Sequence, residues 1–131
     1  MVQLIENVTD FIRALGKEDQ GKVVIIDFYA DWCVPCKKIS PAFEALAEKY
    51  DDCSFYKINV DNDGTKSICA VCEISSLPSF LIFCGSKYIT RTLGTNLDEI
   101  EQGISQVRKQ GILQRISKRQ KQDKQDEQDY D

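Results

Sequence analysis

The chain has 131 residues, 17 of them basic and 21 acidic, and 42% hydrophobic residues, which is typical of one globular domain with its own core. The net charge of −4 argues against nucleic acid as a main partner, and no apolar stretch approaches the ~20 residues that a membrane span needs. Histidine is absent, which excludes Cys-His and Ser-His-Asp catalysis and every metal site that needs a histidine ligand.

The N-terminal residues indicate both the cellular compartment and the first secondary-structure elements. Met1 to Glu6 has neither the basic start nor the apolar core of a secretory signal, so we expect a cytoplasmic protein in a reducing compartment. Residues 2–5 predict a short strand. A helix with one apolar face should follow, capped by Asn7 and ended by Gly16. Its expected core face is the set Val8, Phe11, Ile12 and Leu15.

The next two elements surround a pair of cysteines. Residues 22–30 are apolar on both faces, which is typical of a central strand covered by helices on both sides. A helix is predicted over 34–50, with apolar residues at helical spacing on its core face.

The second half predicts a strand, a short helix and two hairpin strands, over 53–60, 65–72, 78–84 and 88–93. Asn96 and Glu99 resemble a capping box that opens a last helix. This order of elements predicts a single α/β domain with a central mixed sheet flanked by helices on both faces.

The end of the chain differs in composition from the rest. We expect a domain over 1–111, with Gly111 interrupting the last helix, and a charged extension over 112–131. From Arg115 onward almost no residue is apolar, which is typical of a solvated and mostly disordered segment. Ile112, Leu113 and Ile116 are the residues with which the helix could continue against a partner.

The segment Trp32-Cys33-Val34-Pro35-Cys36-Lys37 joins the central strand to the second helix. The unpaired N–H groups and partial positive charge of a helix N-terminus favour thiolate over thiol, so Cys33 is a candidate nucleophile. Cys36 lies one turn further on, where it can attack a mixed disulfide formed by Cys33. The spacing therefore predicts thiol–disulfide chemistry.

Residues 27–37, from Asp27 to Lys37, resemble the active-site segment of the thioredoxin family. The likeness extends over about residues 2–110 and includes Pro41, Lys57, Asp61, Leu77-Pro78 and Gly94. The resemblance implies the thioredoxin fold and a protein-disulfide reductase without cofactor or bound metal.

The resemblance also implies a role for each residue of the reaction centre. Cys33 would be the attacking cysteine and Cys36 the resolving one. Asp27 would be a desolvated carboxyl with a raised pKa that exchanges a proton near neutrality, and Lys57 the cation beside it. A carboxylate at the strand end, facing water, is the alternative for Asp27.

A second set is expected to contact the substrate, and comprises Trp32, Val34, Pro35, Leu77, Pro78 and Gly94. Pro78 resembles the cis-proline of the family, although a trans turn proline is the alternative. Trp32 would shield the dithiol, unless it only packs. Val34 stands where the family usually has glycine, and Tyr29 where it often has tryptophan or a small residue.

The expected partners are disulfide-containing proteins and thioredoxin reductase. Val34 together with the extension also resembles the thioredoxin-like light chains of axonemal outer-arm dynein. That resemblance implies an alternative function as a redox-sensing subunit of a large assembly in the cilium, bound through the extension.

The other four cysteines have several interpretations. Cys69 and Cys72 form a second C-x-x-C. A zinc site with Cys33 and Cys36 is disfavoured because the pairs are separated by more than the usual ~15–20 residues. Small buried residues, a regulatory disulfide, glutathionylation and a dimer contact remain as alternatives. Cys53 and Cys84 are expected to be inert core thiols.

Overall fold

One mixed sheet of five strands, in the order β1-β3-β2-β4-β5, forms the centre of the computed structural model, which describes residues 1–16 and 21–128. The strands are β1 (Val2–Leu4), β2 (Val23–Tyr29), β3 (Ser54–Asn59), β4 (Ser79–Cys84) and β5 (Lys87–Leu93). β3 runs parallel to β1 and β2, and β4 runs antiparallel to β2 and β5. The apolar strand β2 is therefore central, as predicted.

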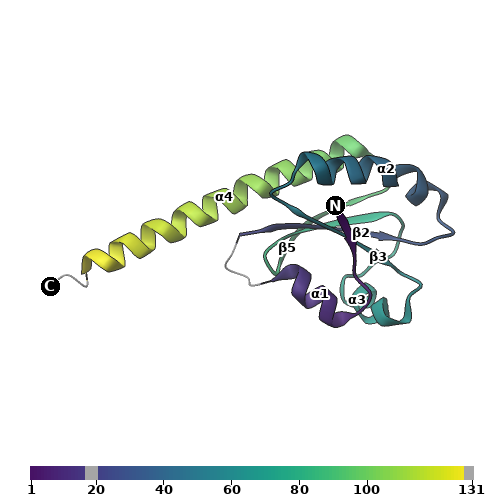
Figure 1. The fold of residues 1–131 in the computed structure, drawn as a ribbon, viewed down its shortest axis with the longest axis horizontal. Coiled ribbons are helices and arrows are strands. Elements are labelled where there is room, and N and C mark those ends of the chain that lie inside the picture. Colours follow the sequence, from purple (N-terminus) through teal and green to yellow (C-terminus); the bar gives the residue numbers. More distant parts are fainter. Residues whose placement is uncertain (17–20, 129–131) are drawn as a thin grey trace.

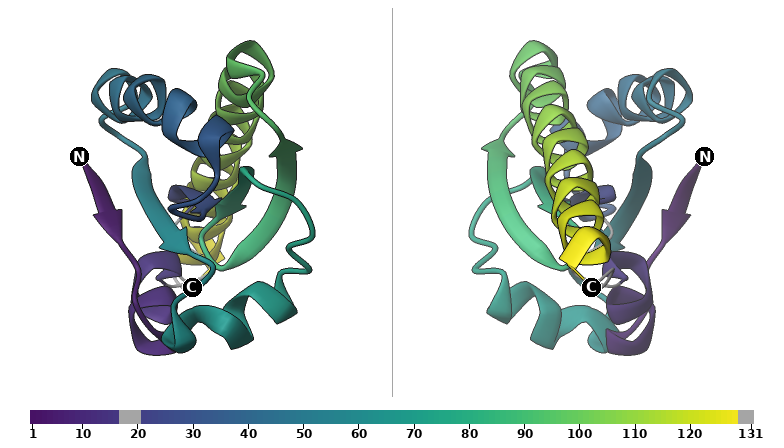
Figure 2. Two further views of the ribbon diagram at one scale, coloured as in Figure 1. Left: turned by 90° about the vertical axis from the view of Figure 1, so that its right-hand side faces the viewer. Right: turned by 90° about the vertical axis from the view of Figure 1, so that its left-hand side faces the viewer.

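Helices cover both faces of this sheet (Figure 2). They are α1 (Val8–Leu15), α2 (Val34–Lys49), the 3₁₀ turn η2 (Asp63–Thr65), α3 (Lys66–Val71) and α4 (Leu97–Gln128). α2 and α4 lie over one face, and α1 and α3 lie over the other. The predicted α/β architecture is confirmed.

The alternation of side chains along β2 builds a core on each face. Val23 and Ile25 pack in one cluster with residues of α2 and α4, while Val24, Ile26 and Phe28 pack in the other with α1 and α3. Because successive strand residues point to opposite faces, one apolar strand supplies both cores. These two cores hold β2 in the middle of the sheet, and the short segment that follows its last residue leads into α2.

The helix caps follow the sequence, but the core face of α1 does not. Asn7 Oδ1 accepts a hydrogen bond from the N–H of Asp10 at 2.8 Å, as expected of an N-cap. The core face of this helix is formed by Phe11, Ala14 and Leu15. The prediction was wrong for Val8 and Ile12, which are 44% and 64% exposed. A short helix lying on a sheet buries only a narrow stripe, and both residues flank it.

The last helix runs through Gly111 without interruption and projects well beyond the sheet (Figure 1). A Cβ at Gly111 would lie 2.6 Å from the carbonyl oxygen of Gly21, so glycine allows α4 to pass close to the chain that leads into β2. Arg115 Nη2 donates to the same oxygen at 3.4 Å. The predicted interruption is therefore wrong, and the described part of the segment that begins at Arg115 is helical to Gln128, where a mostly disordered segment was expected. The charged residues at 129–131 lie outside the described residues.

In the described part of the chain, no helix is both long enough and apolar enough to span a membrane.

Candidate active site

Cys33 and Cys36 form a disulfide at the N-terminus of α2. Cys33 is the N-cap residue, and its Sγ accepts a hydrogen bond from the N–H of Cys36 at 3.3 Å. The two Cα atoms are 5.3 Å apart, and both residues are buried. When this bond is reduced, the N–H groups and dipole of the helix favour a thiolate at Cys33.

A buried carboxyl group lies beneath the disulfide. Asp27 on β2 is 5% exposed and pairs in register with Lys57 on β3. Burial raises the pKa of Asp27 to about 7, against an opposing effect of the Lys57 charge. Among the described groups Asp27 Oδ1 has no hydrogen-bond partner. The alternative of a carboxylate facing water is excluded by this burial.

A cavity of about 120 Å³ connects this carboxyl with Cys36, since Asp27, Cys36 and Lys57 all line it. A space of this size has room for water molecules between polar groups. The arrangement allows a proton to pass between the carboxyl and the Cys36 thiol at a pH near neutrality.

Tyr29 belongs to the same cavity and was not predicted as a site residue. The Lys57 ammonium lies 5.8 Å from the centre of the Tyr29 ring, in a cation–π contact. Tyr29 and Asp27 are two positions apart on β2 and therefore point to the same face. That period of two is the signal that could have placed Tyr29 beside Asp27.

An open groove of about 660 Å³ lies along the other side of the disulfide. Of the predicted substrate contacts, it brings together Trp32, Val34, Pro35 and Leu77 with Cys33. Trp32 is 69% exposed, so the alternative that it only packs does not hold.

The other two predicted substrate contacts, Pro78 and Gly94, lie next to each other. The Leu77–Pro78 peptide bond is cis, as the resemblance implied, and the Pro78 carbonyl accepts a hydrogen bond from the Gly94 N–H at 3.0 Å. Neither Pro78 nor Gly94 is among the residues that line the groove.

Some residues of the groove wall, and Asp61, which holds the Trp32 side chain, were not predicted as site residues. Asp61 Oδ2 accepts a hydrogen bond from Trp32 Nε1 at 2.9 Å, and the Asp61 N–H in turn donates to Asn59 Oδ1 at 3.0 Å. Cys69 and Ile74 come from the segment around α3 and form part of the groove wall. The signal for Asp61 was its position after β3, because the carboxyl ends of the parallel strands β2 and β3 meet at one edge of the sheet.

The four remaining cysteines are outside the disulfide and fall into two classes. Cys53 and Cys84 are buried, and burial raises the pKa of Cys53 to about 11, which fits an inert core thiol. Cys69 and Cys72 are only partly buried. No three Cys, Asp or Glu residues of the described ranges come together in a way that could hold a metal ion.

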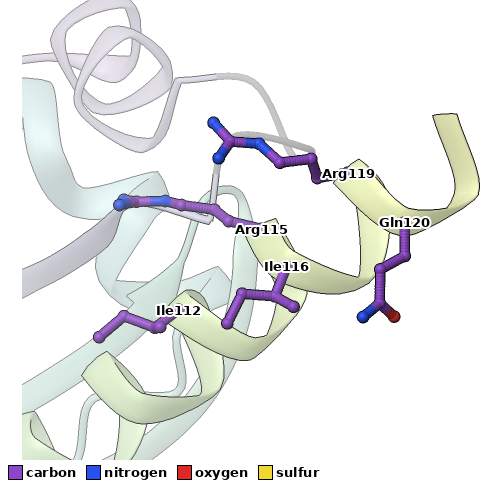
Figure 3. Close-up of a pocket in the computed structure, with 5 residues that line it drawn as sticks. All are labelled: Ile112, Arg115, Ile116, Arg119 and Gln120. Carbon is purple, nitrogen blue, oxygen red and sulfur yellow. The ribbon is translucent and has the colours of Figure 1, made fainter. Parts of the chain in front are cut away.

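A further hollow lies on the projecting part of α4 (Figure 3). It is lined by Ile112, Arg115, Ile116, Arg119 and Gln120, all from this one helix. These side chains include no thiol or carboxyl group, so this hollow has no chemistry comparable with that of the disulfide.

Comparison with known proteins agrees with this geometry. Residues 3–106 match the model of the family described as Thioredoxin. The chain is 47% identical over 103 residues to the thioredoxin-like protein R548 of Acanthamoeba polyphaga mimivirus, covering 79% of this chain and 74% of that protein. It is 38% identical over 105 residues to thioredoxin-2 of Saccharomyces cerevisiae, covering 80% and 97%.

Solved structures give the same result. A thioredoxin of Malassezia sympodialis (Mala s 13) superposes with a TM-score of 0.74 at 32% identity, covering 82% of this chain and 91% of that one. A chain from the complex of ferredoxin:thioredoxin reductase with thioredoxin f2 superposes with a TM-score of 0.72 at 28% identity, covering 82% and 94%.

Proposed function

This chain belongs to the thioredoxin family and has its fold, and from that premise we propose how its residues divide the work of a thiol–disulfide oxidoreductase. The reaction is the reduction of protein disulfides by the dithiol of Cys33 and Cys36. The observation that supports the division of roles is the disulfide at the start of α2, with Asp27 buried beneath it.

The first step is the attack of the Cys33 thiolate on one sulfur of the substrate disulfide. The substrate bond breaks, its second sulfur leaves as a thiolate, and Cys33 is joined to the substrate in a mixed disulfide. Trp32, Val34, Pro35 and Leu77 hold the substrate chain in the groove beside Cys33.

The second step releases the substrate. Cys36 loses its proton to Asp27 through the shared cavity and attacks Cys33 Sγ. The mixed disulfide breaks, the substrate sulfur leaves as a thiolate and the Cys33–Cys36 disulfide forms. Lys57 limits how far burial raises the pKa of Asp27, which keeps this carboxyl able to accept a proton near neutrality.

We further propose that the substrates are cytoplasmic proteins and that a thioredoxin reductase restores the dithiol. A structural neighbour is itself a thioredoxin in complex with a reductase, which supports this class of partner. The residues that the reductase would contact are those of the groove around Cys33, since both partners must reach the same sulfur.

Trapping of substrates tests the division of roles. The Cys36→Ser variant should accumulate mixed disulfides at Cys33, because the resolving thiol is missing. The Cys33→Ser variant is the matched control and should capture nothing. Equal capture by the two variants, measured by non-reducing electrophoresis and mass spectrometry, would show that Cys33 is not the attacking residue.

A second candidate function, as a subunit of a larger assembly, is favoured by one observation. Ile112, Leu113 and Ile116 are 46%, 63% and 49% exposed on the part of α4 that follows the domain at 1–111. None of the relatives compared above is named as an axonemal dynein light chain, so a ciliary assembly has no support from them. A free species near 14.9 kDa in gel filtration of native extract would contradict the subunit function.

A further inference from the structure

Tyr29 is the last residue of β2 and has no part in the reaction steps above, yet it lines the cavity that joins Asp27 to Cys36. Asp27 and Tyr29 are two positions apart on one strand, so their side chains point to the same face of the sheet. Lys57 lies opposite Asp27 in the register of β2 and β3 and lines the cavity too. An aromatic ring, a carboxyl and an ammonium group therefore meet in one small space.

The Lys57 ammonium has two candidate partners in this cavity. Its observed partner is the Tyr29 ring, whose centre lies 5.8 Å away, within the range of a cation–π contact. Among the described residues no salt bridge joins Lys57 to Asp27, and Asp27 Oδ1 is buried without a hydrogen-bond partner. The long and flexible stem of a lysine would let the ammonium reach the neighbouring carboxylate as well. The structure thus places the cation on the ring and not on the carboxylate.

Two further charged residues, Asp31 and Lys37, line the same cavity. The pKa of Asp27 is set by burial, which raises it, and by the Lys57 charge, which opposes burial. Burial also raises the pKa of the Tyr29 hydroxyl, as do the carboxylates of Asp31 and Asp27, so the ring is a neutral phenol at pH 7. The distance of one cation from Asp27 therefore controls how basic this carboxyl is.

A direct ion pair with Lys57 would change the chemistry of Asp27. An opposite charge within about 4–6 Å lowers the pKa of a carboxyl by about one to three units. The ion pair would give the buried oxygen a partner, but it would also make Asp27 a poor acceptor for the proton of Cys36. The cation–π contact competes with that ion pair, because both need the same ammonium group.

We propose that Tyr29 is a positioning residue of the reaction centre, whose ring holds the Lys57 ammonium away from direct contact with Asp27. The carboxyl is thereby left free to take the proton of Cys36 in the second step. This inference rests on the role of Asp27 in the proposed function. Tyr29 acts through Lys57 and not on the substrate itself.

Titration of the Asp27 carboxyl in the oxidised full-length chain tests the proposal, because Cys33 and Cys36 do not titrate in that form. Carboxyl ¹³C NMR gives the midpoint, and Asp27→Asn identifies the signal. In Tyr29→Leu the ammonium can reach the carboxylate, so the midpoint should fall by about one to two units. Tyr29→Phe keeps the ring face and should titrate within about 0.3 unit of wild type. An unchanged or raised midpoint in Tyr29→Leu, or an equal fall in Tyr29→Phe, would overturn the proposal.

The same substitution in a Lys57→Met background shows whether Tyr29 acts through the cation. There Tyr29→Leu should move the Asp27 midpoint by less than about 0.3 unit, since no ammonium remains to be redirected. A shift as large as in the wild-type background would mean that the ring acts by keeping water out, and would overturn the proposal. Tyr29→Trp, whose indole face binds cations more strongly, should leave the midpoint at or above that of wild type, and a fall would overturn it as well.

The proposed function is checked separately, by insulin reduction with a recycling reductant. The titration uses the oxidised chain and needs no turnover, so failure of the proposal for Tyr29 leaves the proposed function intact. Failure of the wild type to reduce insulin would overturn the proposed function, and with it the inference that rests on it.

Discussion

The two C-x-x-C segments have the same spacing but opposite positions on their helices. Cys33 is the N-cap of the sixteen-residue helix α2, whereas Cys72 is the C-cap of the six-residue helix α3. An anion is stabilised at the first position and not at the second. The end of the helix on which a cysteine lies, and not the spacing of the two cysteines, therefore decides which pair is suited to supply the nucleophile.

The groups around each pair strengthen this difference. The first pair shares a cavity with Asp27, a carboxyl whose pKa lies at about 7 and which can accept a proton. The second pair has the Thr65 hydroxyl and the Arg91 charge near it. The surroundings of Cys33 and Cys36 favour fast thiol–disulfide exchange, whereas those of Cys69 and Cys72 favour slower exchange.

Removal of the nucleophile should have the largest effect. Cys33→Ser should lower kcat/KM for insulin reduction with a recycling reductant by at least about 1000-fold, because no other thiol has the same activation. Cys69→Ser is the matched variant of the second pair and should retain activity within about twofold under these recycling conditions. A comparable loss in both variants would contradict the difference between the pairs.

The buried carboxyl should reveal itself in the pH dependence of stability. Because the pKa of Asp27 is raised in the folded state, from 3.8 to about 7, the folded chain holds this proton more tightly than the unfolded chain. Stability is thus lost as the pH rises from about 4 to about 7, by about 4 kcal/mol. Asp27→Asn should remove this loss, so its free energy of unfolding relative to wild type should rise by that amount between pH 4 and pH 8.

Urea unfolding at several pH values measures this change. Lys57→Met is a useful companion, since removal of the cation should raise the pKa of Asp27 further and move the loss to higher pH. A difference between Asp27→Asn and wild type that does not vary with pH would contradict the raised pKa.

The rate of alkylation compares the two pairs directly. In the reduced chain at pH 7, Cys33 should react with iodoacetamide about 100-fold faster than Cys69 or Cys72, because the thiolate is the reactive form. Peptide mapping by mass spectrometry gives the three rates in one sample. Equal rates would mean that the N-terminus of α2 does not activate its cysteine.

The contact between Trp32 and Asp61 should have a smaller effect. Asp61→Ala removes the acceptor of the indole N–H, so the exposed ring loses its fixed orientation over the groove. KM for insulin should rise by about threefold to tenfold with kcat nearly unchanged. Asp63→Ala, an exposed carboxylate of the same turn, serves as the control. A fall in kcat alone would place Asp61 in the chemical step instead.

Deletion of 112–131 should have the smallest effect on the active site. The segment contacts the domain through Arg115, which donates to the Gly21 carbonyl, and through Gln114, which accepts from Cys84 Sγ, and each hydrogen bond of this kind contributes about 1 kcal/mol to stability. We expect kcat/KM within about twofold of the full chain and a slightly lower melting temperature. A large loss of activity would mean that the domain does not end at residue 111.

Local patterns were enough to predict the sheet, the helix caps and the two catalytic cysteines. The apolar run of β2, the caps Asn7 and Asn96 and the position of Cys33 before a helix are all visible within a few residues of sequence. Such features depend on neighbours along the chain, so their physical cause is already present in the sequence.

The features that were missed depend on contacts between distant segments. Gly111 suggested a break in α4 because its partner, the carbonyl of Gly21, is ninety positions away and cannot be recognised from either segment. The presence of Cys69 in the groove of Cys33 likewise results from the packing of α3 on the sheet. Packing of this kind overrides the local preference of a single residue.

The exposure of Trp32 has a practical consequence. The sequence contains a single tryptophan, and its ring lies beside the sulfur that gains and loses the disulfide bond. Because a nearby disulfide quenches indole emission, the intrinsic fluorescence of the unlabelled protein should brighten when Cys33 and Cys36 are reduced. The redox state of the Cys33–Cys36 pair can therefore be followed in real time by intrinsic tryptophan fluorescence, without a dye.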